Sequence, residues 1–558
     1  MDIDIKNRED KNREVHEMAN KLQNPIIPGF YPDPSICRVG DDFYLAVSSF
    51  ELCPGVPVFH SKDLANWELI SHAVTPANGF HVEANCGVGG VMAPTIRYWK
   101  GTYYIINANF SDKGNYIVTA ADPRGPWSDP HWMDDVPGID ASIFFDTDDK
   151  CYVIGTGDVW ENEGGHMERG IWIAEYDIEN FKVVSEPFTI FNSALRGGAA
   201  PEAPHIYHIG DYYYLIYAEG GTEHYHAVMS ARSKELFTFF ERNPANPVMT
   251  HRHMGFASPI INIGHADLID LPDGSWYAVM LGSRLIDGAA KNLGRETFIC
   301  PVVWERDWPL MSPQTGKVEW EYDAPASLPW TPWPKPERRD DFDADTLGAD
   351  WTFWGTPYES YWKLEDSALR IRCISKAMTK DLEAMGFGVN ISRENYRPFI
   401  AKRQLQPCYS FSTQMHFIPK GSETAGLAVL QAMNHQLRVE VCANGDEQKL
   451  RVVLSTADWN VPPYFPGFES QTQIKTLFET PWSEACTVLR IDMVGEDWTV
   501  YAGTAEDSLR KLCSVDGLLI NPEKVGCMVG TMLGVFASGN GTDSDNEAVF
   551  DWFDCGEI

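Results

Sequence analysis

The sequence predicts an all-β protein in which a β-propeller is followed by a β-sandwich. Three observations lead to this fold class. Five units, each a tight turn followed by an aromatic-rich strand, return at intervals of roughly 50 to 60 residues, a period typical of propeller blades. A proline-rich segment then interrupts the chain at 324–339. Beyond it, many short alternating strands separated by polar turns predict a sandwich.

The repeated units predict five β-hairpins, and each is preceded by a second short pattern. The hairpins fall at 40–45, 100–105, 148–153, 210–215 and 272–277. In the preceding pattern, an Asp, Ala, Glu or His is followed by one or two small residues or prolines and, within four residues, by Ile or Leu. The pattern occurs at 33–36, 93–96, 140–143, 202–206 and 265–268. Because the first strand of each blade runs along the propeller axis, these positions should converge at one mouth of the central channel. The alignment therefore gathers Asp33, Asp140 and Glu202, with His265 nearby.

The first of these patterns places Asp33 between Pro32 and Pro34. Proline removes a backbone donor and narrows the conformations open to its neighbours. We therefore expect Asp33 to be held rigidly, in an extended conformation.

Composition limits the classes of partner. The 558 residues are 44% hydrophobic and carry a formal net charge of −34, which argues against nucleic acid and anionic membranes as partners. A neutral substrate such as a sugar fits this charge. Residues 1–20 are polar and charged and do not resemble a signal peptide, and no stretch is long and apolar enough to span a membrane. The 12 cysteines show no metal-ligand spacing, so we expect reduced thiols and a cytoplasmic protein.

Three acids at matching repeat positions favour a catalytic centre. A single Asp or Glu is usually a solvated surface residue, but crowded carboxylates cost energy unless their pKa values separate. Two alternatives stay open on this reasoning. A non-catalytic carbohydrate-binding protein would need aromatic walls but could dispense with the acids, and so could a scaffold propeller.

At these residues the chain resembles glycoside hydrolase family 43, in its β-xylosidase branch. The motifs that carry the resemblance are Tyr31-Pro32-Asp33-Pro34-Ser35-Ile36, Asp140-Ala141-Ser142, Glu202-Ala203-Pro204-His205, Ala218-Glu219-Gly220-Gly221-Thr222, Gly264-His265-Ala266 and Leu293-Gly294-Arg295-Glu296-Thr297. The resemblance implies a five-bladed propeller with an inverting, exo-acting site that removes terminal β-D-xylose from small oligosaccharides. It also implies a concanavalin-like jelly roll for the sandwich and assembly into a homo-oligomer.

The resemblance also implies roles for single residues. Asp33 corresponds to the general base, Glu202 to the general acid, and Asp140 to a third carboxylate that orients the acid and keeps its pKa raised. Arg295 corresponds to an arginine that binds the terminal sugar. His265 corresponds to a channel histidine that contacts the sugar or lies beside a bound Ca²⁺ in some members, so a calcium site is an added prediction although no cofactor is required.

Some residues predicted to line the sugar site differ from those usual in the xylosidase branch. Met92 stands where related xylosidases usually have tryptophan, and Leu52-Cys53 replaces an aromatic pair, while Phe50 remains as a platform for the sugar. An α-L-arabinofuranosidase, or an enzyme acting on both sugars, is therefore the alternative. Phe536 lies where relatives supply an aromatic side chain that closes the site, although a core position for it is also expected.

These observations divide the chain into four parts. We predict an N-terminal extension at 1–23, the catalytic propeller at 24–323, a proline-rich linker at 324–339 and the β-sandwich at 340–558.

Overall fold

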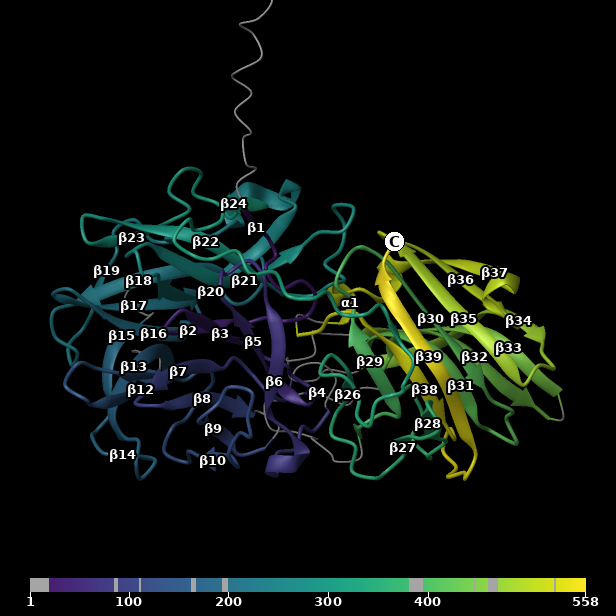
Figure 1. The fold of residues 1–558 in the computed structure, drawn as a ribbon. Helices are drawn as coiled ribbons and strands as arrows, with labels where there is room; N and C mark the ends of the chain where they lie inside the picture. Colours follow the sequence, from purple (N-terminus) through teal and green to yellow (C-terminus); the bar gives the residue numbers. More distant parts are fainter. Residues whose placement is uncertain are drawn as a thin grey trace, which may run out of the picture.

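The computed structural model describes residues 20–84, 89–109, 112–161, 167–192, 199–380, 395–445, 447–459, 470–525 and 528–558. Its chain folds into a β-propeller and a β-sandwich that lie side by side (Figure 1). The propeller is built from the first half of the chain and the sandwich from the second.

Five antiparallel sheets form the blades, which confirms the predicted architecture. Blade 1 contains β2 (Ser35–Val39), β3 (Asp42–Ala46), β5 (Gly55–Ser61) and β6 (Glu68–Val74). Blade 2 contains β7 (Thr95–Trp99), β8 (Thr102–Asn109), β9 (Gly114–Ala120) and β10 (His131–Trp132). Blade 3 contains β11 (Ser142–Phe145), β12 (Cys151–Glu161), β13 (Met167–Asp177), β14 (Lys182–Val183) and β15 (Phe188–Asn192).

The remaining two blades follow the same order. Blade 4 contains β16 (Glu202–Ile209), β17 (Tyr212–Glu219), β18 (Ala227–Ser233) and β19 (Glu241–Arg242). Blade 5 contains β20 (Ile260–Asp270), β21 (Trp276–Arg284), β22 (Glu296–Glu305) and β23 (Trp308–Met311). Each predicted turn-plus-strand unit is the hairpin between the first and second strands of its blade. Buried aliphatic and aromatic side chains fill the spaces between neighbouring blades.

A short strand joins the two ends of the propeller. β1 (Lys21–Gln23) pairs with β24 (Glu321–Asp323) in an antiparallel ladder. The three residues of β1 lie in the segment predicted as an N-terminal extension, and their ladder ties that segment to the end of the propeller. The four domain limits given above stay predictions.

The sandwich consists of two packed sheets. The first contains β25 (Arg339–Asp340), β27 (Trp362–Leu364), β28 (Leu369–Arg372), β30 (Cys408–His416), β35 (Cys486–Val494), β36 (Asp497–Gly503), β37 (Arg510–Asp516) and β39 (Glu547–Glu557). The second contains β26 (Thr352–Trp354), β29 (Phe399–Arg403), β31 (Thr424–Ala432), β32 (His435–Asn444), β33 (Glu447–Trp459), β34 (Ser470–Pro481) and β38 (Met532–Ser538). Alternate residues of both sheets point inward and form one core.

The second sheet also includes a strand from the propeller. β4 (Leu52–Cys53) pairs with β26 at its edge, so the two domains share a β-ladder. An apolar cluster with members from both domains covers this junction; it includes Phe30, Phe50, Met92 and Phe536 and is called the interdomain cluster below. The sandwich is therefore fixed against the propeller at the connection between β3 and β5 of blade 1.

Helix is scarce in the described residues. The α-helix α1 spans Pro522–Val525, and short 3-10 helices span Pro76–Asn78, Arg252–Ala257, Glu506–Ser508 and Gly517–Ile520. Among the residues that the structure describes, no helix is long and apolar enough to cross a membrane.

Candidate active site

Asp33 lies directly before β2 at the axial end of blade 1. Its φ of 57° belongs to the left-handed region, so the predicted extended conformation is wrong. Aspartate tolerates this region better than most residues, and surrounding contacts must hold it there because such backbone costs about 1 to 3 kcal/mol. Those contacts are the Ser48 hydroxyl, which donates to Oδ2, and the Arg295 guanidinium, which donates to Oδ1 at 2.7 Å.

The left-handed conformation recurs at the equivalent place in other blades. Asp140 has a φ of 55°, His265 has a φ of 53°, and in blade 4 the left-handed residue is Ala203, next to Glu202. The ladders of blades 4 and 5 are irregular at these points. A kink at the start of the innermost strand re-aims side chains, as β-bulges do beside active sites. Its recurrence explains why the matching positions face one channel.

The three carboxylates lie close enough to shift one another's pKa values, in line with the convergence predicted from the five repeats. Asp140 and Glu202 lie close enough for the negative charge of Glu202, and that of Asp33, to raise the pKa of Asp140. His265 Nδ1 lies 3.8 Å from Asp33 Oδ1. The residues gathered by sequence alignment thus form one cluster.

The surroundings of Asp33 favour its ionised form. Asp33 is only 4% exposed, and burial alone would raise its pKa. The positive charge of Arg295, together with His265 and the Ser48 hydrogen bond, outweighs burial and lowers the pKa below its ordinary value. Asp33 is therefore a carboxylate at neutral pH.

Glu202 and Asp140 have the opposite tendency. Burial raises the pKa of Glu202, and the negative charge of Asp33 adds to this, against the opposing charges of Arg169 and Arg295. Burial and the two neighbouring acids raise the pKa of Asp140 well above its ordinary value. The pKa values of Glu202 and Asp140 are therefore displaced upward, while that of the neighbouring Asp33 is displaced downward.

Arg295 connects the propeller site to the sandwich. It is 3% exposed and donates to Asp33, to Thr222 Oγ1 at 3.0 Å and to Met528 Sδ at 3.2 Å. Its guanidinium lies over the ring of Phe50, 5.2 Å from the centroid. Met528 belongs to the sandwich, so the second domain reaches the arginine that holds Asp33.

Three side chains predicted to line the site lie in the interdomain cluster. Phe50, Met92 and Phe536 are at most 4% exposed, and all three pack there. Phe50 stacks on Phe30 at 5.7 Å between ring centroids and reaches the site through Arg295. Phe536 is fully buried in β38, the core position that was also expected for it. The roles of these three residues in sugar binding stay predictions.

Below the acids, a polar network fills the channel. Asp267 is fully buried and accepts hydrogen bonds from Arg97 at 2.8 and 3.1 Å and from Ser35 at 2.6 Å, and Tyr207 also donates to it. The bidentate charge of Arg97 keeps the pKa of Asp267 well below its ordinary range, although burial acts to raise it. These side chains come from four blades, so the network fixes the blades around the site.

The described residues show no preformed site for the predicted calcium ion, which stays a prediction. Among them, no group of three or more His, Cys, Asp or Glu side chains is placed to hold a metal ion. Next to His265, the Asp33 carboxylate is already bound by Arg295 and Ser48, and Asp267 by Arg97. Calcium takes six to eight oxygen ligands, including waters, so these two carboxylates alone would not form a site for it.

Sequence reasoning missed four residues that support the site. Ser48 and Met528 carry no motif, and each becomes visible only through its contact with Asp33 or Arg295. Arg169, whose Nη1 lies 4.0 Å from Glu202 Oε1, comes from blade 3. Thr222 ends the Ala218–Thr222 motif and could have been singled out from it.

Two neighbouring carboxyl groups whose pKa values are displaced in opposite directions are the arrangement used to hydrolyse glycosidic bonds. The comparisons with known proteins agree. Residues 22–309 match the family described as "Glycosyl hydrolases family 43", and residues 339–555 match "Beta xylosidase C-terminal Concanavalin A-like domain". The chain belongs to glycoside hydrolase family 43 and is a glycosidase. Hydrolases of this family generally need no cofactor.

Similar proteins match over nearly the whole chain. A "Xylosidase/arabinosidase" of Butyrivibrio fibrisolvens is 36% identical, covering 96% of this chain and 99% of its own. A "Non-reducing end alpha-L-arabinofuranosidase" of Bacteroides ovatus is 39% identical, covering 96% and 94%. The crystal structure of a xylan beta-1,4-xylosidase of Bacillus halodurans has a TM-score of 0.83 at 29% identity, covering 96% and 100%.

Proposed function

We propose that this glycosidase removes terminal β-D-xylose from the non-reducing end of xylo-oligosaccharides with inversion of the anomeric configuration. One observation carries the proposal: Arg295 lowers the pKa of Asp33 while burial raises the pKa of Glu202 in the same pocket. An inverting glycosidase needs this division between an ionised base and a protonated acid.

In the proposed reaction, Asp33 accepts a proton from water as that water attacks the anomeric carbon. Glu202 donates its proton to the glycosidic oxygen as the bond to the leaving sugar breaks. In inverting glycosidases the two carboxyl groups are about 6.5 to 9.5 Å apart, which leaves room for the water. Asp140 is the third carboxylate of the reaction and orients the acid; the charge of Glu202 contributes to the raised pKa of Asp140.

The surroundings of Arg295 support exo action. Its guanidinium packs over the ring of Phe50. It donates hydrogen bonds to Asp33, Thr222 and Met528. Arg295 Nε is buried and has no hydrogen-bond partner among the described residues. The arginine and the buried ring of Phe50 close this side of the cluster, which would stop a longer sugar chain from continuing past it.

Removal of α-L-arabinofuranose is the second candidate. The aliphatic Leu52 and Met92 pack in the interdomain cluster, where relatives of the xylosidase branch usually carry aromatic residues. Less directional walls suit a differently shaped pentose ring. The names of the two relatives above, which include arabinosidase and arabinofuranosidase, agree with this candidate.

One assay tests both candidates. Hydrolysis of aryl β-D-xyloside and aryl α-L-arabinofuranoside is measured, and the anomer first released is identified by NMR. Absence of turnover on both substrates would refute the proposed function, and initial release of the unchanged anomer would refute inversion.

Glu202→Ala tests the role of the acid. Because only poor leaving groups need protonation, we expect this variant to lose roughly 100-fold or more on xylobiose but far less on an activated aryl xyloside. Wild-type and variant rates on the two substrates give the comparison. Equal losses on both would contradict Glu202 as the general acid.

We also propose that the protein acts in a reducing compartment such as the cytoplasm and forms a homo-oligomer. The ten cysteines of the described ranges are free thiols, which suits such a compartment. Homo-oligomerisation rests on resemblance to the xylosidase branch. Light scattering after gel filtration measures the mass, and a value of 62.8 kDa would mean a monomer.

A further inference from the structure

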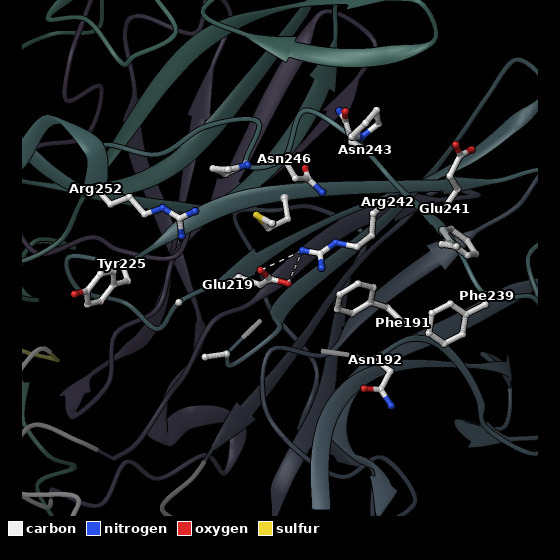
Figure 2. Close-up of a pocket in the computed structure, with 16 residues that line it drawn as sticks. Phe191, Asn192, Glu219, Tyr225, Phe239, Glu241, Arg242, Asn243, Asn246 and Arg252 are labelled. Carbon is white, nitrogen blue, oxygen red and sulfur yellow. Dashed lines mark hydrogen bonds and ion pairs between the residues drawn. The ribbon is translucent and has the colours of Figure 1, made fainter. Parts of the chain in front are cut away.

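A large pocket lies between blades 3 and 4, apart from the three acids. Its volume is about 1090 Å³, and its walls come from the ends of β15, β17 and β19 and from the loops that follow β17 and β19. Typical ligand pockets measure about 300 to 1,000 Å³, so this space can hold more than one sugar ring. Figure 2 shows the side chains that line it.

The pocket is balanced in charge, although the chain as a whole is strongly acidic. At its floor the Arg242 guanidinium donates to both oxygens of Glu219 at 3.2 and 3.4 Å, and both side chains are mostly buried (Figure 2). The other charged side chains of the lining are one acid, Glu241, and one base, Arg252. Two positive and two negative groups leave no net charge, which suits a neutral ligand.

The rim offers aromatic faces and polar groups. Tyr225 is 67% exposed and Phe239 is 48% exposed, and they lie on opposite sides of the ion pair in the view of Figure 2. Arg252, on the side of Tyr225, and Asn192, on the side of Phe239, add polar side chains to the lining (Figure 2). Exposed rings beside hydrogen-bonding groups are the surfaces that bind sugars, whose faces are apolar and whose edges are polar.

Two paths connect the pocket to the acid. Arg169, 4.0 Å from Glu202, precedes Gly170, which pairs with Asn192 across the β13–β15 ladder. Glu202 itself pairs with Ala218, which precedes the pocket residue Glu219. Neighbouring strands lie about 4.8 Å apart, so the pocket begins only a few strand spacings from the acid.

We propose that this pocket is a distal subsite for the leaving group, holding the sugar units of a neutral oligosaccharide that lie beyond the scissile bond. The inference rests on the proposed function, because the general acid protonates the leaving-group side of the bond. The pocket lies at the end of β17, which pairs with β16, the strand that begins at Glu202. The terminal sugar remains in the acid cluster, while the rest of the chain extends across blade 4.

Chain length and two rim variants test the proposal. We expect the kcat/KM of the wild type to rise from xylobiose to xylopentaose. Tyr225→Ala and Phe239→Ala should each lower kcat/KM on xylopentaose by about tenfold, the effect of one lost aromatic contact. Activity on aryl xyloside should not change. Phe237→Ala is the matched control, since Phe237 is 40% exposed on the same blade but does not line the pocket.

Three outcomes decide the matter. Equal kcat/KM on all chain lengths, or equal losses in the rim variants and in Phe237→Ala, would overturn the subsite. Titration of xylopentaose into Glu202→Gln by calorimetry provides a readout without turnover, and Tyr225→Ala added to it should weaken binding about tenfold. If wild-type enzyme cleaved no glycoside while this loss of binding persisted, the proposed function would fail and the subsite would stand.

Discussion

Glu496 gives the sharpest prediction about stability. It lies in the turn between β35 and β36 of the sandwich and is 8% exposed, and its Oε2 accepts a hydrogen bond of 2.7 Å from Asn292 of the propeller. Its Oε1 has no hydrogen-bond partner among the described residues. Burial raises the pKa of Glu496 to about 7, and the nearby negative charges of Asp287, Asp516 and Glu523 add to this against the Asn292 bond.

The sign of the pH dependence follows from this raised pKa. Between the ordinary value of 4.5 and about 7, the folded protein binds more protons at Glu496 than the unfolded chain does, so stability falls as pH rises through this window. At about 1.4 kcal/mol per pKa unit, the full effect is roughly 3 kcal/mol. Glu496→Gln keeps an acceptor for Asn292 but cannot ionise, so it should remove this loss.

Urea denaturation at pH 5 and pH 8 measures the effect. Wild type should lose roughly 2 to 3 kcal/mol more than Glu496→Gln between these pH values. Glu484→Gln, at an exposed acid of the same domain, should follow wild type. Parallel profiles for wild type and Glu496→Gln would refute the reasoning, because they would mean that Glu496 titrates alike in the folded and unfolded chains.

Two further predictions concern the support of Asp33. Arg295→Gln removes the charge that lowers the pKa of Asp33, so the acidic limb of the kcat/KM profile should move to higher pH and kcat/KM should fall about 10- to 100-fold; an unmoved limb would contradict Asp33 as the base. Gly294→Ala places a Cβ 2.5 Å from Val529 O at a φ of 77°, and it should cost about 1 to 3 kcal/mol in urea denaturation and lower activity by displacing Arg295. Gly288→Ala, at a φ of 70° with open space around the new Cβ, is its control, and equal losses in both would mean that the backbone alone explains the effect.

Much of the fold could be predicted because propeller blades are encoded locally. Each hairpin is set by a turn and by the strand that follows it, so five copies reveal five blades without any long-range information. The alternation in 488–501 likewise predicts the hairpin of β35 and β36. The ladder between β4 and β26 could not be predicted, because it joins two-residue and three-residue strands that lie far apart in the sequence.

For the site, the sequence by itself determined which side chains meet. Asp33, Asp140, Glu202 and His265 occupy matching places in their blades, and a repeated architecture brings matching places to one axis. Arg295 was found only through the motif that surrounds it. The chemistry of the acids was therefore open to sequence reasoning.

The tertiary structure alone decided how these groups are held and charged. The left-handed backbone of Asp33 opposes the local preference created by Pro34, and only contacts from Ser48 and Arg295 make it tenable. Likewise, the pKa values of Asp33 and Glu202 separate because of burial and because of Arg295. Arg295 directly precedes β22 of blade 5, far from Asp33 in the sequence, and donates a hydrogen bond to Met528 of the sandwich. Protonation depends on distances between charges and on exclusion of water, which exist only once the chain is folded.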